Sequence, residues 1–404
     1  MKLRASYGTV GNDGTDSWYA WQTLYDINKN ADRPGFLQSD LEGNMDLSWE
    51  VNKTFDLALD FGLFKNRLTG SVEFFHRVSD NLLFEVPKPL SSGVLTQWQN
   101  VGSMYNQGVE LQLSADLIRT KDFTWNASFN ATKVKNRITK LPQNEIINGT
   151  KRYTEGHSMY DFWLYEYAGV DPTTGDALFY KGGWVQEDVI DEATGLPKVD
   201  PVTGKNVTKD KLDENGLRIF DPTAEREKVH KYTDADKYYV GTSIPKLYGS
   251  LTNTFTYKNF SLNVLLTYGI GGLKLDTTYA GLLSVSSLGA SLHKDILNSW
   301  HKEGDVTSIP RIDNGDSNYQ NPTSSRFLTN ASYLNIRNIT FSYSLPKQLV
   351  KKIDLAGIRV YGSVENAHLF CARKGMDPQY NFAGTSYNDY SPARTMSLGI
   401  NIQF

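Results

Sequence analysis

The chain has 404 residues, a net charge of −3 and 12% aromatic residues, a length that fits two or three ordinary domains or one large β structure. The small net charge gives no indication of nucleic-acid binding, and the absence of any apolar run of 18 residues excludes a transmembrane helix. The single cysteine, Cys371, excludes an internal disulfide and a paired-cysteine metal or redox site.

The amino-terminal stretch "MKLRASYGTV" contains no apolar core of a signal peptide. After it, apolar residues recur at every second position, for example in "LSWEVNKTFDLALDF", "GVELQLSADL" and "FTWNASFNAT". Such alternation predicts strands with one dry and one wet face. Leu111, Leu113, Phe129 and Leu262 are predicted to lie on the dry face, and Gln112, Asn130 and Asn263 on the wet face. The pattern alone also suits a soluble sandwich, whose dry face packs on a core.

The turns are predicted from changes in the parity of the apolar positions. Parity switches across Lys258-Asn259, which indicates a two-residue hairpin loop. It also switches around "GLFKNR", and it is kept across "IRTKD", which predicts a five-residue loop. The stretch "SLPKQLVKKIDLAGI" is expected to contain one short helical turn between two strands.

Short and long connections alternate along the chain. The predicted strands lie near residues 2–8, 46–61, 68–78, 107–117, 123–132, 161–169, 177–182, 247–257, 260–268, 332–345, 358–366 and 394–404. Tight turns at one end and long loops at the other are typical of an outer-membrane β-barrel, and the strand lengths suit a tilted crossing of about 9–11 residues. A soluble sandwich has no reason to sort its loops by length.

The connecting segments offer few candidates for chemistry. Asp171, Asp191 and Asp200 each begin an Asp-x-x-Thr-Gly pattern, which predicts hairpin turns more readily than calcium sites. The six histidines are scattered without a metal-binding pair. A cluster of aromatic residues in a predicted outer loop could stack on a sugar or could pack the loop itself. The cluster consists of Trp18, Tyr19, Trp21 and Tyr25.

Several stretches in order resemble the carboxy-terminal part of SusC/RagA-type TonB-dependent outer-membrane transporters. They include "KLRASYGTVGN", "NVGSMYNQGVELQL", "GVDPTTGD", "IPKLYGSLTNTFTYKNFSLNV", "ASYLNIRNITFSYSLPKQL" and "SPARTMSLGINIQF". The resemblance runs from Leu3 to Phe404. It implies an all-β fold, namely an antiparallel transmembrane β-barrel of 22 strands. With about 12 predicted strands, this chain would hold part of that barrel. On its own, the chain would form an open curved sheet.

Members of that family are much longer, with an amino-terminal plug and a TonB-contacting segment before the barrel. We therefore expect residues 1–404 to be the carboxy-terminal part of such a barrel, a fragment without a plug domain. The resemblance implies a location in the outer membrane of a Gram-negative cell and uptake of glycans or, less often, peptides. The implied partners are outer-membrane lipid, a SusD-like surface lipoprotein and the TonB system, which acts through the missing amino-terminal part. No cofactor and no enzyme chemistry are expected.

The chain ends in "TMSLGINIQF", where apolar residues alternate up to the last position. Outer-membrane barrels commonly end in such a strand with a final aromatic residue, and the resemblance implies recognition by the barrel-assembly machinery. Ser397, Gly399, Ile402 and Phe404 occupy the positions of that assembly signal. An ordinary amphipathic closing strand would explain the alternation without requiring Phe404.

Two other classes of function stay open at this point. A soluble or surface-bound carbohydrate-binding β protein would share the alternation and the loop aromatics. An enzyme is less favoured, because no pair of carboxylates lies in a recognisable motif. The sequence names neither the substrate nor the residues that contact it.

Overall fold

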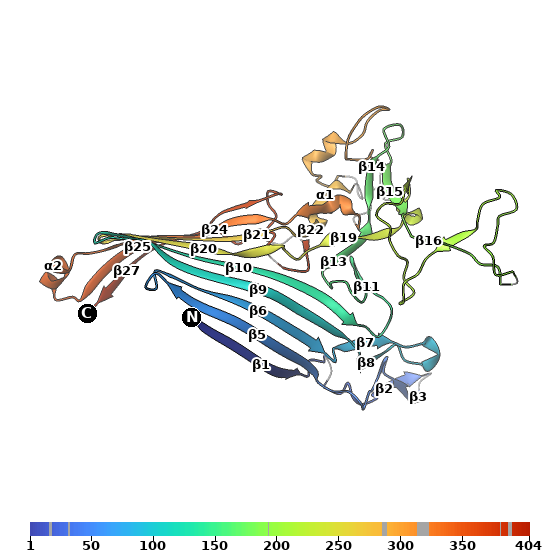
Figure 1. The fold of residues 1–404 in the computed structure, drawn as a ribbon, viewed down its shortest axis with the longest axis horizontal. Coiled ribbons are helices and arrows are strands. Elements are labelled where there is room, and N and C mark those ends of the chain that lie inside the picture. Colours follow the sequence, from blue (N-terminus) through green and yellow to red (C-terminus); the bar gives the residue numbers. More distant parts are fainter. Residues whose placement is uncertain are drawn as a thin grey trace.

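A computed structural model describes residues 1–15, 18–30, 33–192, 194–284, 289–312, 323–379, 381–386 and 390–404. Its main feature is a ten-stranded sheet with smaller sheets clustered beyond one end (Figure 1). The strands of the large sheet lie in the order β1 (Lys2–Asn12), β5 (Glu50–Leu63), β6 (Leu68–Asp80), β9 (Ser103–Arg119), β10 (Phe123–Lys140), β20 (Leu247–Tyr257), β21 (Phe260–Ile270), β24 (Tyr333–Ser344), β25 (Gly357–Cys371) and β27 (Thr395–Gln403).

No helix among the described residues is long and apolar enough to cross a membrane.

Neighbouring strands of the large sheet are all antiparallel, and the predicted turns join them. Tyr257 pairs with Phe260 across the two-residue loop, where Lys258 has a φ of 51°. Leu63 pairs with Leu68 across a loop with three consecutive positive φ angles. The helical turn before β25 is present as α2 (Lys347–Val350) and η6 (Lys351–Ile353). These turns lie at one end of the sheet (Figure 1).

The register separates side chains as the alternation predicts, because directly opposed residues of antiparallel strands share a face. The face with the apolar set, here called the apolar face, carries Leu57, Leu59, Val72, Phe74, Val109, Leu111, Leu113, Phe129, Leu251, Leu262, Phe341, Leu398 and Ile400. The opposite, polar face carries Ser71, Glu73, Glu110, Gln112, Asn130, Ser250, Asn263, Thr267, Asn335, Thr340 and Ser397.

Loop residues fold back over the polar face. The side chain of Gln379 accepts hydrogen bonds from Thr267 and Asn335 at 3.3 Å each, and Ser158 donates to Asn136 at 2.9 Å. On the apolar face, by contrast, Phe341 is 50% exposed and Leu398 is 92% exposed. A contiguous exposed apolar surface of this kind marks a lipid or protein interface.

The prediction of about twelve barrel strands is wrong in number. The segments predicted at 161–169 and 177–182 do form strands, namely β13 (Asp161–Tyr165), β14 (Tyr167–Val170) and β15 (Ala177–Gly182). They belong to smaller sheets: β13 pairs with β12 (Lys151–Tyr153) and β19 (Lys237–Thr242), and β15 with β14 and β18 (Arg226–Val229). Local alternation does not specify which sheet a strand joins.

Several boundaries also differ from the predictions: β1, β9 and β25 are longer than predicted, and three further differences concern a loop, the start of β5 and the end of β10. The loop between β9 and β10 has three residues, 120–122, because a register shift at Trp125 and Asn126 restores the parity. β5 begins at Glu50, so Leu47 and Trp49 precede the strand. β10 continues to Lys140, well beyond the predicted end at residue 132.

The remaining elements lie at the long-loop end (Figure 1). They are β2 (Tyr25–Asn30), β3 (Arg33–Gln38), β4 (Leu41–Glu42), β7 (Leu83–Pro87), η1 (Leu90–Ser92), β8 (Thr96–Asn100), β11 (Ile146–Asn148), β16 (Gln186–Asp188), β17 (Thr208–Asp210), η2 (Tyr232–Asp234), β22 (Leu273–Asp276), α1 (Thr277–Leu283), η3 (Lys294–Asn298), η5 (Ser325–Phe327), β23 (Leu328–Asn330) and β26 (Thr385–Ser386). The buried hydrophobic cluster is also here, around Phe162, Leu164, Leu275 and Phe327. Burial against protein therefore stabilises the loops more than the large sheet.

The three Asp-x-x-Thr-Gly stretches form the predicted turns. Asp171, Asp191 and Asp200 each accept a backbone hydrogen bond from two or three residues ahead. The glycine that closes each turn has a φ between 68° and 77°, which favours glycine because it lacks a Cβ. In the described residues no group of three or more His, Cys, Asp or Glu side chains is arranged to hold a metal ion.

Candidate functional site

Four regions of the structure are candidates for function: the two edges of the sheet, the loop aromatics, and two pockets formed by the loops. β1 and β27 stand at the two ends of the strand order, and neither has a second neighbour among the described strands. Each therefore presents a row of backbone N–H and C=O groups that another strand could pair with.

The closing strand β27 pairs with β25, from Gly357 with Gln403 to Glu365 with Thr395. Ser397 and Gly399 lie on the polar face, while Ile402 has the parity of the apolar face. Phe404 follows the last residue of the strand and is 95% exposed. The structure thus places three residues of the predicted assembly signal on β27 and the fourth, Phe404, directly after it, and their role in assembly stays a prediction.

Gly399 has a packing role that the sequence did not reveal. A Cβ at this position would lie 2.6 Å from Cε1 of Tyr361 and nearer still to Cζ. Tyr361 is its direct partner on β25, so its ring lies over the glycine on the polar face. Any side chain at residue 399 would displace that ring. Cross-strand pairs in which an aromatic ring covers a glycine help to fix register.

The four loop aromatics are only partly brought together. Trp18 and Trp21 line a cavity of about 550 Å³ with Trp49 and Met45, whereas Tyr19 and Tyr25 are not among its lining residues. Trp18 is 93% exposed and Trp21 is 46% exposed. Three indole rings around one open cavity can stack on a ligand with flat apolar faces, such as a sugar or an aromatic side chain.

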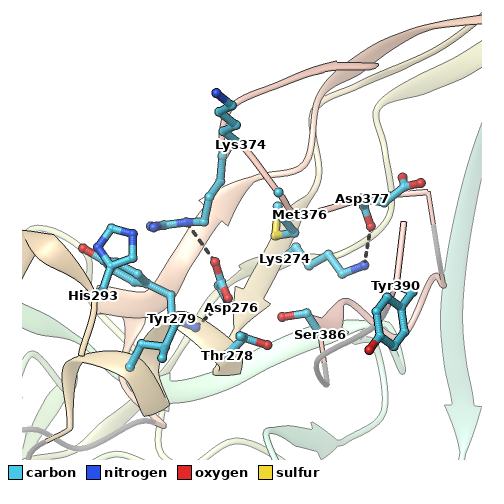
Figure 2. A pocket seen from close by; sticks show the side chains of 13 residues that line it. Lys274, Asp276, Thr278, Tyr279, His293, Lys374, Met376, Asp377, Ser386 and Tyr390 are labelled. Carbon is cyan, nitrogen blue, oxygen red and sulfur yellow. Dashed lines mark hydrogen bonds and ion pairs between the residues drawn. The ribbon is translucent and has the colours of Figure 1, made fainter. Parts of the chain in front are cut away.

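A second pocket, of about 410 Å³, lies where β22, α1 and β26 meet the segment after β25 (Figure 2). The Nζ of Lys274, a side chain that is 1% exposed, donates to the carbonyl of Asp377 at 2.9 Å. Asp276 accepts from the backbone N–H of Tyr279 at 2.9 Å, which caps α1. Arg373 pairs with Asp276 at 2.8 Å.

The pocket in Figure 2 combines both signs of charge with aromatic surface. The guanidinium of Arg373 lies 3.7 Å from the ring centroid of Tyr279, whose hydroxyl donates to Asp295 at 2.9 Å. Burial raises the pKa of Tyr279 above its ordinary value, which favours the protonated phenol that donates this hydrogen bond. Asp276 and Asp377 offset two of the three cations that line the pocket, so one positive charge remains, and the pocket suits a ligand that is rich in hydrogen-bonding groups and carries at most one net negative charge.

A third cavity, of about 470 Å³, lies in the loop sheets and was not predicted from the sequence. Its walls contain Trp163, Trp184, Tyr238 and Tyr239. Burial raises the pKa of Tyr238 to about 12. The high density of aromatic residues in "YDFWLYEYAG" could have indicated an aromatic cavity from the sequence. Nothing in the local sequence indicates that this stretch lies near Trp184.

The chain has relatives among known proteins. Residues 1–367 match the family model described as TonB dependent receptor-like, beta-barrel. The chain is similar to TonB-dependent receptor P3 of Formosa agariphila, with 29% identity over all of this chain and 39% of that protein. It is similar to TonB-dependent receptor SusC of Bacteroides thetaiotaomicron, with 28% identity over all of this chain and 37% of that protein.

Among solved structures, the RagAB peptide transporter matches all of this chain and 40% of the solved chain, with 29% identity and a TM-score of 0.76. The chain therefore spans about two fifths of the length of the relatives it matches.

Proposed function

Since this chain belongs to the TonB-dependent receptor β-barrel family and is of the SusC/RagA type, we propose that it forms part of an outer-membrane barrel that imports a nutrient. The observation that carries the proposal is the separation of the large sheet into a polar face under the loops and an exposed apolar face. Lipid covers the apolar face, and the polar face lines the lumen. A barrel satisfies backbone groups in lipid only when it closes, so the free edges of β1 and β27 pair with strands of a longer chain.

The domain assignment follows the same reasoning. Residues 1–404 constitute the carboxy-terminal part of the barrel, and the remainder of a longer protein completes it and couples it to TonB. A SusD-like lipoprotein covers the loop end, and the barrel-assembly machinery recognises β27. Support comes from the relatives named SusC and RagAB and from the match over the whole of this chain.

The substrate is an oligosaccharide, with a peptide as the second candidate. Trp18 and Trp21 in their shared cavity favour a sugar, because pyranose rings stack on indole faces through their apolar C–H surface. The similarity to RagAB, which is a peptide transporter, favours a peptide. The soluble carbohydrate-binding protein is disfavoured, because its apolar face would need a protein core, and the loops cover the opposite face.

Deletion of the encoding gene tests the function. Uptake of fluorescent oligosaccharide and peptide pools is measured in the deletion strain, in a complemented strain and in parent cells treated with a protonophore. We expect oligosaccharide uptake to be lost in the deletion strain and in treated cells. Loss of peptide uptake alone would reassign the substrate, and unchanged uptake of both pools would refute import of either class.

Trp18→Ala and Trp21→Ala test the stacking role, with Tyr19→Ala as a matched control outside the cavity. Loss of stacking on one ring should weaken binding by roughly 1–3 kcal/mol per ring if the energies known for base–aromatic stacking apply. Oligosaccharide uptake at low concentration should fall for the two tryptophan variants and not for the tyrosine variant. An equal effect at all three positions would indicate loop packing instead.

A further inference from the structure

β10, a central strand of the large sheet, carries three cations on the apolar face near its end at the long loops. On β10 the odd-numbered residues from Phe123 to Ala131 are apolar, and the next three odd positions are Lys133, Lys135 and Arg137. The register from Thr132 to Arg137 is continuous, without a bulge. The three cations therefore lie on the same face as Phe129, directly beyond the apolar residues of β10. We call them the basic ladder.

The even-numbered residues of the same part of β10 show that the basic ladder points away from the loops. Asn136 lies between Lys135 and Arg137, is 2% exposed, and accepts hydrogen bonds from the hydroxyl and backbone of the loop at Ser158 and Met159. Loops thus cover the even positions. The odd positions face away from them, and Lys133 and Lys135 are exposed.

Neighbouring strands change character at the same level. Lys133 is opposite Val109, the last apolar residue of β9 on this face, while Lys135 is opposite Gln107 and Arg137 is opposite Tyr105. On β6 the continuous apolar run on this face ends at Phe74, and His76 follows, with its ring 5.4 Å from that of Tyr105; beyond it Val78 lies opposite Tyr105. A boundary between apolar and polar residues that crosses three strands in register marks the outer limit of the hydrocarbon layer.

The cations of the basic ladder are available to a ligand. Among the described residues, neither Lys133, Lys135 nor Arg137 takes part in an ion pair. Lys53 lies on the same face but three strands away, on β5, and differs because Asp80 pairs with it at 2.9 Å. Three like charges spaced two residues apart along one strand repel one another, and an anion that bridges them relieves the repulsion.

We propose that the basic ladder binds the phosphorylated headgroup of a lipid in the outer leaflet. The acyl chains of such a lipid would lie along Val109 and Phe74, and its phosphates would sit at the level of Lys133 to Arg137. Charge complementarity and continuity with the apolar band both favour this occupant over a soluble anion. The proposal rests on the placement in the outer membrane, and it adds a lipid site separate from the path of the substrate.

The test uses the complete protein that contains this chain, purified in mild detergent. Binding of bisphosphorylated lipid A is measured by native mass spectrometry, with phosphatidylethanolamine as the zwitterionic comparison. The variant K133Q/K135Q/R137Q removes the basic ladder. The control K198Q/K205Q/K209Q removes the same charge from exposed positions on the long loop.

Each cation near an anionic surface contributes about a fivefold effect, so the ladder variant should bind lipid A on the order of 100-fold more weakly. The control should bind like the parent. If the triple variant does not assemble, K135Q is compared on its assembled fraction, where about a fivefold loss is expected and an unchanged affinity would overturn the proposal.

Two further results would overturn it. One is equal binding of lipid A by the parent and the ladder variant. The other is complete displacement of lipid A by inorganic phosphate, which would make the site a general anion site. Neither result would affect the proposed import function, because fractionation of the protein with the outer membrane and substrate uptake are measured independently.

Discussion

Replacing Leu113 with arginine tests the assignment of the apolar face to lipid. Leu113 is the middle of the five apolar positions that β9 presents on this face, from Val109 to Leu117. It lies opposite Phe129 on β10 and Gly70 on β6. If lipid covers the face, the position is close to the bilayer midplane.

The expected cost follows from this depth. An arginine at the midplane of a lipid-facing strand costs roughly 2–4 kcal/mol, and near the interface roughly 0–1 kcal/mol. Leu113→Arg should therefore lower the folded-to-unfolded ratio about 30- to 1000-fold. Val109→Arg lies beside Lys133 at the outer boundary and should cost much less. Gln112→Arg, on the polar face, should also cost far less.

The assay is equilibrium unfolding of the complete protein in lipid vesicles with guanidinium, followed by tryptophan fluorescence. Leu113→Met controls for loss of shape, because such swaps usually cost less than about 1.5 kcal/mol. Similar losses for Leu113→Arg and Gln112→Arg would refute the two-sided assignment. A cost that does not change between Val109 and Leu113 would refute the placement of the midplane.

Three further outcomes are expected. Gly399→Val should destabilise the closing strand by roughly 1–3 kcal/mol through overpacking on Tyr361. In a double-mutant cycle, adding Tyr361→Ala should recover most of this lost stability. Additive losses of the two substitutions in unfolding experiments would exclude the packing role. Deletion of Phe404 should lower the assembled fraction in outer-membrane preparations while synthesis is unchanged, with Phe404→Tyr tolerated; normal assembly of the deletion would leave β27 as a closing strand only. Burial lowers the pKa of Lys151 from 10.5 to about 7. Between these pH values the native state therefore binds fewer protons than the unfolded state. The stability of the loop segment around Lys151 should rise with pH from about 7 to about 10 and should not change with pH below 7. Hydrogen exchange of residues 151–162, corrected for intrinsic rates, should show this slope, and Lys151→Met should abolish it; the same slope in the variant would assign the effect to another group.

The sequence by itself determined the two-sided nature of the sheet. Alternation is a local property: each strand's side chains leave in opposite directions whatever the strand pairs with. The tight turns were also readable from local sequence. A two-residue loop such as Lys258-Asn259 switches the parity of the apolar positions, and the Asp side chain of each Asp-x-x-Thr-Gly stretch accepts a hydrogen bond from the backbone two or three residues ahead. The opposite faces of Leu113 and Gln112 could therefore be predicted without knowing which strands lie beside β9.

Only the tertiary structure decided which strands share a sheet and which loop residues meet. β13 and β15 alternate like barrel strands, yet they pair with other loop strands, because pairing across long connections depends on contacts that no local pattern encodes. For the same reason Lys274 meets Asp377 only in the fold. The close approach of Tyr361 to Gly399 likewise depends on register between two strands, so a motif that reads as a terminal signal is also a packing contact.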